Sequence, residues 1–349
     1  MSGSPQTGQG VQVAAPARRS TVIMGRQDFV SVLFRAINAE LYKIRRRMMS
    51  KVLAIIGILF IIAGFVILSF TVASQAAAIA QKPATEFLPL SCIQASKQSC
   101  ATQADLAKQA ALQSATAPLH LPNSFVNAVG MINFIGLFLL VTLAGTIVGG
   151  EYHVGTIRLM LTKGPTRTQF LLAKAGAILA CIAITFLVLV PTGIITGTVL
   201  MFIQAPGIAI NFSFLTGMWV LHALLYLLAA ILGLFVYTMI ALCLSTLGKA
   251  TVAGVAGTIV WWIVEGALAD ALGLLASLGR GPLNDFLKAI PDYFIGNNIA
   301  TLLSNQSRYL EGGQPTTASD LHALLVLFFY LIVFIGLAWW VSERRDITN

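Results

Sequence analysis

Residues Val52–Phe70 read VLAIIGILFIIAGFVILSF, an uncharged run that decides the class of fold. A helix needs about 20 mostly apolar residues to cross the hydrocarbon core of a bilayer, and this run meets that length. The whole chain of 349 residues is similar in character, with 57% apolar residues, 10% charged residues and a mean hydropathy of +0.84. A soluble domain usually carries about 25% charged residues. The composition therefore indicates an integral membrane protein and excludes a soluble enzyme, a nucleic-acid-binding module and a disordered chain.

Further apolar stretches of spanning length follow along the chain. They are Phe125–Val148, Phe170–Ile203, Trp219–Leu247, Ala250–Gly273 and Ala323–Val341. Pro191 lies inside the third span, where we expect it to kink the helix. Together these stretches predict an all-α integral membrane protein with six transmembrane helices. An even number of spans places both termini on the same side of the membrane.

The distribution of Lys and Arg predicts which side that is, because the cytoplasmic loops of membrane proteins collect basic residues. The side of the termini holds Arg18, Arg19, Arg26, Arg35, Lys43, Arg45, Arg46, Arg47, Lys51, Arg158, Lys163, Arg167, Lys174, Lys249, Arg344 and Arg345. The opposite side holds Lys82, Lys97, Lys108, Arg280, Lys288 and Arg308. We therefore expect cytoplasmic termini in a plasma-membrane protein. The net charge of +9 is then explained by the inner leaflet, without nucleic acid as a partner.

The segments outside the spans differ in character. Residues 1–27 are expected to form a disordered cytoplasmic tail, because their first part is rich in Gly, Ser, Gln, Ala and Pro. The outer loop 74–124 is rich in Ala and Gln and is expected to be partly helical. The outer loop 274–322 contains Phe286–Leu303, which Pro291 interrupts. We expect short outer helices there, either one helix or a re-entrant pair.

Cys92 and Cys100 both fall in the first outer loop, on the oxidising side of the predicted topology. A disulfide between them would close that loop, and two separate external thiols are the alternative.

The sequence shows no pattern for catalysis or metal binding. The four histidines fall in four different segments without a partner at ligand spacing, so we expect no metal site. Around Gly248-Lys249 the chain lacks the earlier Gly and the Ser or Thr of a phosphate-binding loop. We therefore expect no catalytic residue and no cofactor bound by this chain, and energy for uphill transport would come from another subunit.

Two cytoplasmic elements carry information, and the first is 28–49. Its apolar residues recur at spacings of four and three, which predicts an amphipathic helix. They are Phe29, Leu33, Ile37, Leu41, Ile44 and Met48. Such a helix would lie flat on the membrane surface in contact with lipid, where each Lys or Arg near anionic lipid adds about 1 kcal/mol. The alternative is a plain basic anchor for the first span.

The second element is the connection 149–165, which reads GGEYHVGTIRLMLTKGP. Gly149-Gly150 would let the membrane helix stop sharply. Ile157, Met160 and Leu161 would form one apolar face of a short helix, and Thr166 with Gln169 would make a capping box for the third span. The pattern predicts a short helix that projects into the cytoplasm for docking. An ordinary loop with one helical turn is the alternative.

Glu151 and the run Gly155-Thr156-Ile157-Arg158 resemble the E-x-x-x-G-T-I-R signature of type-2 ATP-binding-cassette (ABC) transporter permeases. The resemblance extends over about 28–347, through Glu40–Lys43, Ile290–Tyr293 and Glu343–Ile347. It implies a six-span permease domain, 28–349, whose coupling helix meets a separate ATPase subunit. The residues that it implies at that contact are Glu151, Tyr152, Gly155, Thr156, Ile157 and Arg158.

The resemblance also implies the wider assembly. ATP and Mg would be bound by the ATPase partner, a second permease copy or a paralogue would complete the pathway, and export is the expected direction. A non-transporting membrane anchor or regulatory subunit is the alternative from another class, and a channel is the third.

Glu265 is the candidate for a residue inside the pathway. It lies within the fifth span next to Trp261 and Trp262, and an ionisable residue inside the membrane is a functional candidate by default. It also lies about 24 Å along the helix from Lys249, near the outer interface where Trp is common. An interfacial charge is therefore the alternative to a residue that lines a transport path.

Overall fold

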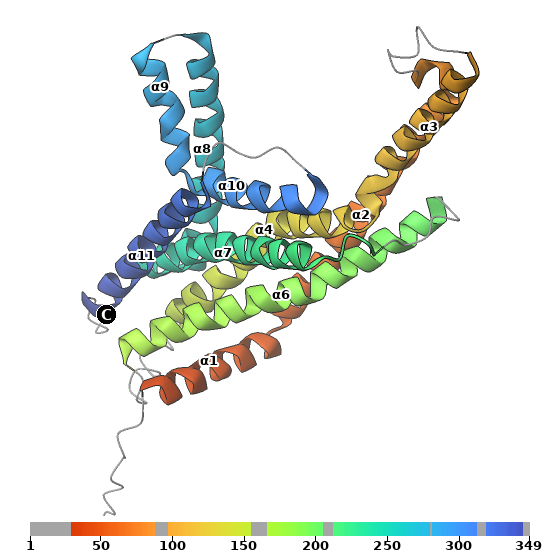
Figure 1. Cartoon of the computed structure of the whole chain (residues 1–349). Coiled ribbons are helices and arrows are strands. Elements are labelled where there is room, and N and C mark those ends of the chain that lie inside the picture. Colours follow the sequence, from red (N-terminus) through yellow and green to blue (C-terminus); the bar gives the residue numbers. More distant parts are fainter. Residues whose placement is uncertain are drawn as a thin grey trace, which may run out of the picture.

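The computed structural model describes residues 29–87, 97–154, 166–204, 212–279, 281–312 and 319–344, and within these ranges the regular structure is helical throughout. The long helices form a bundle from which two helical projections extend (Figure 1). The helices are α1 (Phe29–Arg46), α2 (Met48–Gln81), α3 (Lys97–Thr116), α4 (Asn123–Val154), α6 (Arg167–Gln204), α7 (Gly217–Gly248), α8 (Thr251–Leu278), α9 (Pro282–Ala289), α10 (Ile295–Ser307) and α11 (Asp320–Arg344). Short helical turns are η1 (Ala84–Phe87), η3 (Ala117–Leu119), η4 (Ile290–Tyr293) and η5 (Arg308–Gly312).

The prediction of six spans is confirmed, because six of the described helices are long and apolar enough to cross a membrane. These are α2, α4, α6, α7, α8 and α11. Each helix contains nearly all of its predicted span, and most of the helices extend past the predicted span at both ends. The 34 residues of α2 reach about 50 Å at the usual rise, which exceeds a hydrocarbon core of about 30 Å. Helix α6 continues without interruption through Pro191.

Helices α4 and α7 lie at the centre of the bundle. Helix α4 packs against α7, α6, α8 and α2, and α7 is buried along most of its length. Small residues allow the close crossings that membrane helices use. A Cβ on Gly193 would lie 2.6 Å from the Cβ of Ala128 on α4, and one on Gly197 would lie 2.9 Å from the Phe65 ring on α2. Gly193 and Gly197 therefore let α6 approach both neighbours.

The amphipathic helix α1 ends earlier than the apolar pattern suggested. The backbone is extended at Arg47, and Met48 begins α2 with 74% of its surface exposed, so Met48 does not belong to the stripe. Helix α1 packs along α6, where Ile37 faces Gly176 and Ile44 is buried. The stripe therefore joins α1 to the bundle. A position of α1 at the membrane surface stays a prediction.

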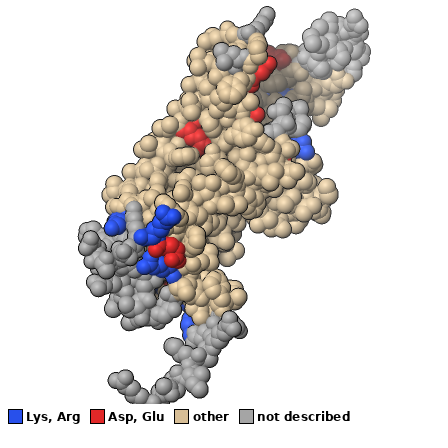
Figure 2. Space-filling view, turned by 90° about the vertical axis from the view of Figure 1, so that its left-hand side faces the viewer, with Lys and Arg blue, Asp and Glu red and all other residues tan. Residues whose placement is uncertain are grey.

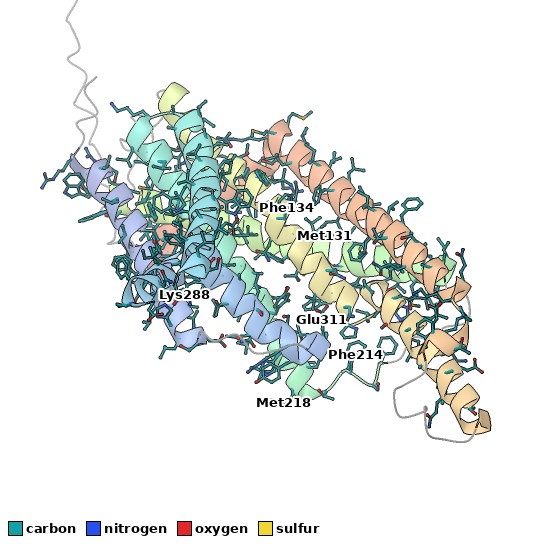
Figure 3. The ribbon with its side chains drawn as sticks, turned by 90° about the horizontal axis from the view of Figure 1, so that it is seen from above. Met131, Phe134, Phe214, Met218, Lys288 and Glu311 are labelled. Atoms are coloured by element: carbon teal, nitrogen blue, oxygen red, sulfur yellow. The ribbon has the colours of Figure 1, made fainter. Side chains whose placement is uncertain are left out.

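Both predicted outer loops contain helices. Helix α3 packs back along α2, and the Lys108 ammonium donates to the carbonyls of Ala80 and Lys82, which end that helix. In the second loop α9 packs against α8, the chain breaks at η4, and α10 packs against α7 and α11. In the view from above, Glu311 lies close to Met218 at the start of α7 and to Phe214 just before that helix (Figure 3), in agreement with the contact between η5 and α7. Whether these short helices re-enter the membrane stays a prediction.

Candidate functional site

Four charged side chains from three helices meet at the end of the bundle where the chain leaves α4 and returns in α6. Lys174 Nζ lies 2.6 Å from Glu151 Oε2 and 3.9 Å from Glu40 Oε2. Lys43 Nζ lies 2.8 Å from Glu40 Oε1 and 3.5 Å from Glu151 Oε1. Two ammonium groups therefore face two carboxylates. We call Glu40, Lys43, Glu151 and Lys174 the charge cluster.

The charge cluster is buried inside the protein. Lys174 is 1% exposed, Glu151 4% and Glu40 6%, and Lys43 closes the cluster on its outer side. The Lys174 ammonium also donates to the Ile147 carbonyl at 3.0 Å. Burial of an isolated charge is strongly unfavourable, whereas a buried ion pair that keeps its hydrogen bonds is tolerated. Each member of the cluster therefore depends on the others.

The charge cluster holds the last turn of α4, next to the segment in which we predicted the coupling helix. Glu151 lies in the last turn of α4, and Lys174 lies about 10 Å along α6 from the start of that helix. The capping box predicted at the start of α6 is confirmed. Gln169 N donates to Thr166 Oγ1 at 3.2 Å, and Thr166 N donates to Gln169 Oε1 at 3.0 Å.

The start of α6 is also attached to the end of α11. The Arg167 guanidinium donates to the carbonyls of Ser342 and Glu343 at 2.7 and 2.8 Å, where the helix dipole of α11 favours a cation. Trp339 Nε1 donates to Thr168 Oγ1 at 3.2 Å. The end of α4 is thus attached to α1 and α6, and the start of α6 is attached to α11. Figure 2 shows the side of the molecule that lies at the left of Figure 1. Lys and Arg gather there with acidic side chains at the lower end, whereas the middle of the surface carries little charge.

The prediction that Gly149-Gly150 ends the membrane helix is wrong, because α4 continues to Val154. The two glycines have different surroundings. A Cβ on Gly149 would overlap the backbone of Thr251, whereas a Cβ on Gly150 would meet nothing within 4 Å. Gly149 is therefore needed for the close approach of α4 and the start of α8.

The sequence-predicted site residues are placed as follows. Glu151 belongs to the charge cluster, and Tyr152 lies in the last turn of α4. Gly155, Thr156, Ile157, Arg158 and Cys92 lie outside the described residues, as does the side chain of Cys100. The proposed disulfide therefore stays a prediction.

Sequence reasoning missed the roles of Glu40 and Lys174. Lys174 gave a signal, because it is the only charged residue in the predicted span Phe170–Ile203 and an ionisable residue inside a span is functional by default. Glu40 gave none, because an acidic residue on an amphipathic basic helix is ordinarily on the solvated face.

Glu265 lies against the beginning of α10. Its Oε1 accepts a hydrogen bond from the Gly296 N–H at 3.1 Å, in the first turn of that helix. The first N–H groups of a helix have no partner within it, and a carboxylate there is favoured by the helix dipole. The contact supports a capping role for Glu265, and a role in a transport path stays a prediction.

The capping role of Glu265 can be tested by substitution. Glu265→Ala should lower the free energy of unfolding by about 0.5–2 kcal/mol, because the first turn of α10 loses its acceptor. Glu265→Gln keeps an acceptor oxygen and should lose less. Thermal unfolding of both variants in detergent, combined with a transport assay, checks this. Equal stability of the two variants with loss of transport in both would favour the pathway role.

A family model described as ABC-2 family transporter protein matches residues 42–347. The chain belongs to this family. The match includes all six spanning helices, the connection between α4 and α6, and three of the four residues of the charge cluster. A search of curated proteins found no match to the chain. The protein is therefore a multi-pass membrane permease of an ABC transporter, and permeases of this family work with an ABC ATPase.

Proposed function

We propose that this permease is the membrane-spanning half of an exporter that uses ATP hydrolysed by a separate ATPase subunit. Two permease halves, identical or paralogous, would surround one pathway, and two ATPase subunits would bind ATP and Mg on the cytoplasmic side. The observation that carries the proposal is the attachment of both flanks of 155–165 to the bundle. Family membership favours transport over the alternative of a non-transporting anchor.

The proposed mechanism follows from this attachment. A loop with loose ends would absorb a displacement by bending. Here the charge cluster joins the end of α4 to α1 and α6, and Arg167 joins the start of α6 to α11. Since packed helices move as rigid elements, a push on 155–165 would shift α4 and α6 together. Closure of the ATPase subunits would thereby reach the spanning helices.

The structure changes the role that we assign to Glu151. Its side chain is paired with Lys174 inside the protein, so we assign Glu151 a positioning role. Contact with the ATPase is then left to Tyr152, Gly155, Thr156, Ile157 and Arg158. Arg158 would offer a planar guanidinium to a carboxylate on the ATPase, and Gly155 would permit close backbone approach.

The coupling role is tested at Arg158. Arg158→Ala should weaken binding of the ATPase by about 1–3 kcal/mol if the pair is desolvated, and Arg158→Glu and Gly155→Trp should weaken it further. The measurements are co-purification of the ATPase and substrate-stimulated ATP hydrolysis. Lys288→Glu, an exposed charge reversal on α9, serves as the control. If Arg158→Glu and Gly155→Trp keep both readouts at the wild-type level, the segment is only a connector.

The proposed orientation is tested by labelling of single cysteines in intact cells. A cysteine at Ala289 on the α9 projection should react with an impermeant maleimide from outside. A cysteine at Arg158 should react only after permeabilisation, because the positive-inside rule places it in the cytoplasm. External labelling at Arg158 would contradict cytoplasmic termini.

A further inference from the structure

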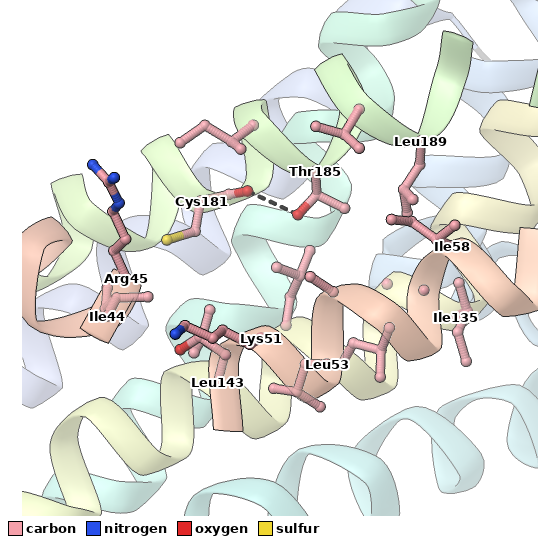
Figure 4. A pocket seen from close by; sticks show the side chains of 18 of the residues that line it. Ile44, Arg45, Lys51, Leu53, Ile58, Ile135, Leu143, Cys181, Thr185 and Leu189 are labelled. Carbon is pink, nitrogen blue, oxygen red and sulfur yellow. Dashed lines mark hydrogen bonds between the residues drawn. The ribbon is translucent and has the colours of Figure 1, made fainter. Parts of the chain in front are cut away.

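A cavity of about 480 Å³ lies between α1, α2, α4 and α6. Its volume is within the range of roughly 300–1,000 Å³ that small-molecule sites occupy. The lining is mostly aliphatic and includes Leu53 and Ile58 of α2, Ile135 and Leu143 of α4, and Leu189 of α6. Figure 4 shows these side chains around the open space.

The charged groups of this cavity gather at one end. Arg45 and Lys51 lie at that end in Figure 4, whereas Ile58, Ile135 and Leu189 lie at the other. No acidic side chain lines the cavity in the described part of the chain. The Ser50 hydroxyl, also in the lining, is buried and has no hydrogen-bond partner among the described residues.

Two helix termini meet at this end, because α1 stops at Arg46 and α2 begins at Met48. Helix α2 begins at Met48, and the residue before it, Arg47, supplies no side-chain cap to the first turn. The N-terminus of a helix attracts anions through its dipole and its free N–H groups. Ser50 and Lys51 lie in this first turn. The carbonyl end of α1, which stops at Arg46, lies beside this N-terminus and opposes its dipole. The positive character at this end of the apolar cavity therefore comes mainly from the side chains of Arg45 and Lys51.

We propose that the cavity holds one acyl chain of an anionic phospholipid, with the phosphate at Arg45 and Lys51. A lipid fits because the rim of the cavity is apolar and opens at the lateral surface of the helix bundle. Ile184 and Val188 of α6 line the cavity and are 53% and 45% exposed, which places them toward the hydrocarbon region. A water-soluble anion would use the basic end and leave the aliphatic part empty.

The bound lipid would stabilise the position of α1. Leu41, Ile44 and Arg45 of α1 line the cavity, while Glu40 and Lys43 of the same helix belong to the charge cluster. An occupied cavity would therefore support the helix whose Lys43 pairs with Glu151. The leaflet concerned is the cytoplasmic one in the orientation proposed above.

The test uses the purified full chain in detergent and a phosphatidylglycerol that carries a photoreactive diazirine on one acyl chain. Phosphatidylcholine with the same chains is the comparison lipid. We expect phosphatidylglycerol to label lining peptides of α2 and α6 at concentrations at least tenfold lower than phosphatidylcholine. The double variant Arg45→Gln/Lys51→Gln should lose this preference. Arg46→Gln removes a neighbouring exposed charge of α1 outside the lining and should keep it.

Two further measurements distinguish the possible occupants. Ala54→Phe fills the cavity and should reduce labelling by both lipids, and Thr185→Phe fills it from α6 if the first variant does not fold. Equal labelling by both lipids in wild type and variants would show ordinary annular lipid and overturn the proposal. If inorganic phosphate reduces labelling by phosphatidylglycerol but not labelling by phosphatidylcholine, the basic end is a site for a free anion. If labelling by both lipids falls when the protein dimerises, a second copy of the chain covers the cavity. None of these readouts needs ATP or the ATPase, so failure here is separate from failure of the proposed function.

Discussion

Replacement of Lys174 by methionine should lower the free energy of unfolding by about 3–5 kcal/mol, the usual cost of removing one partner from a buried ion pair. The substitution keeps an unbranched side chain that is one heavy atom shorter, and it removes the charge. Glu40 and Glu151 would then face Lys43 alone, and the shortest contact of the cluster, 2.6 Å between Lys174 and Glu151, would be lost. Chemical or thermal unfolding in detergent micelles measures the loss.

Lys82→Met is the matched control for this experiment. Lys82 forms an ion pair with Glu86 at 3.3 Å, but the two side chains are 57% and 52% exposed. Exposed pairs of this kind contribute between about 0 and 1 kcal/mol. The same chemical change should therefore have little effect there. If Lys82→Met and Lys174→Met destabilise equally, the charge cluster has no special importance.

A double variant tests whether Lys174 acts through Glu151. Glu151→Gln removes the facing charge, so Lys174→Met/Glu151→Gln should cost less than the sum of the two single changes. Residues in one ion-pair network commonly deviate from additivity by about 0.5–3 kcal/mol. Additive losses would show that the two side chains contribute independently.

The spanning helices could be predicted from the sequence because the bilayer imposes a length that apolar runs must meet. Their ends could not, because the helices continue into polar regions where apolar character is no longer required. Helix α2 continues to Gln81 and packs there against α3. The end of α1 could not be predicted either, because the apolar spacing continues through Met48 although the backbone is extended at Arg47.

The charge cluster could be predicted only in part. Lys174 inside an apolar span indicates that some partner must exist, since an unpaired charge there is costly. The identity of the partner depends on how α1 and α4 pack against α6, and no local pattern encodes that. The family motif pointed to Glu151 as a surface contact, whereas the structure pairs it with Lys174 inside the protein.

Gly149 and Gly150 show the same limit at adjacent positions. In the sequence they form a pair that favours a helix end, and only the approach of α8 distinguishes them. The Gly149 side of α4 lies against Thr251, and the neighbouring Gly145 lies against Val255 one turn away. The crossing of α4 and α8 thus uses small residues four apart, as close helix pairs in membranes commonly do.

Gly149→Ala should therefore destabilise the protein, whereas Gly150→Ala should not. A Cβ at position 149 would overlap the backbone of Thr251, which cannot move aside as a flexible side chain would, so α4 and α8 must separate. Overpacking of this kind costs about 1–3 kcal/mol and occasionally more. At position 150 a Cβ meets nothing within 4 Å, and the better helix propensity of Ala should keep stability at the wild-type level or raise it by up to about 1 kcal/mol.

The two alanine variants are compared by thermal unfolding in the same detergent, with the yield of monodisperse protein as a second readout. The two variants each add one methyl group, at adjacent residues of α4. They therefore have the same composition, and a difference in stability between them reflects the position of the added methyl group. Gly149→Ser should follow Gly149→Ala, because its Cβ occupies the same position. Equal stability of Gly149→Ala and Gly150→Ala would mean that α4 and α8 do not meet through their backbones at this point. The close crossing of α4 and α8 next to Glu151 would then be wrong, whereas the attachment of α4 to α1 and α6 rests on separate contacts in the charge cluster.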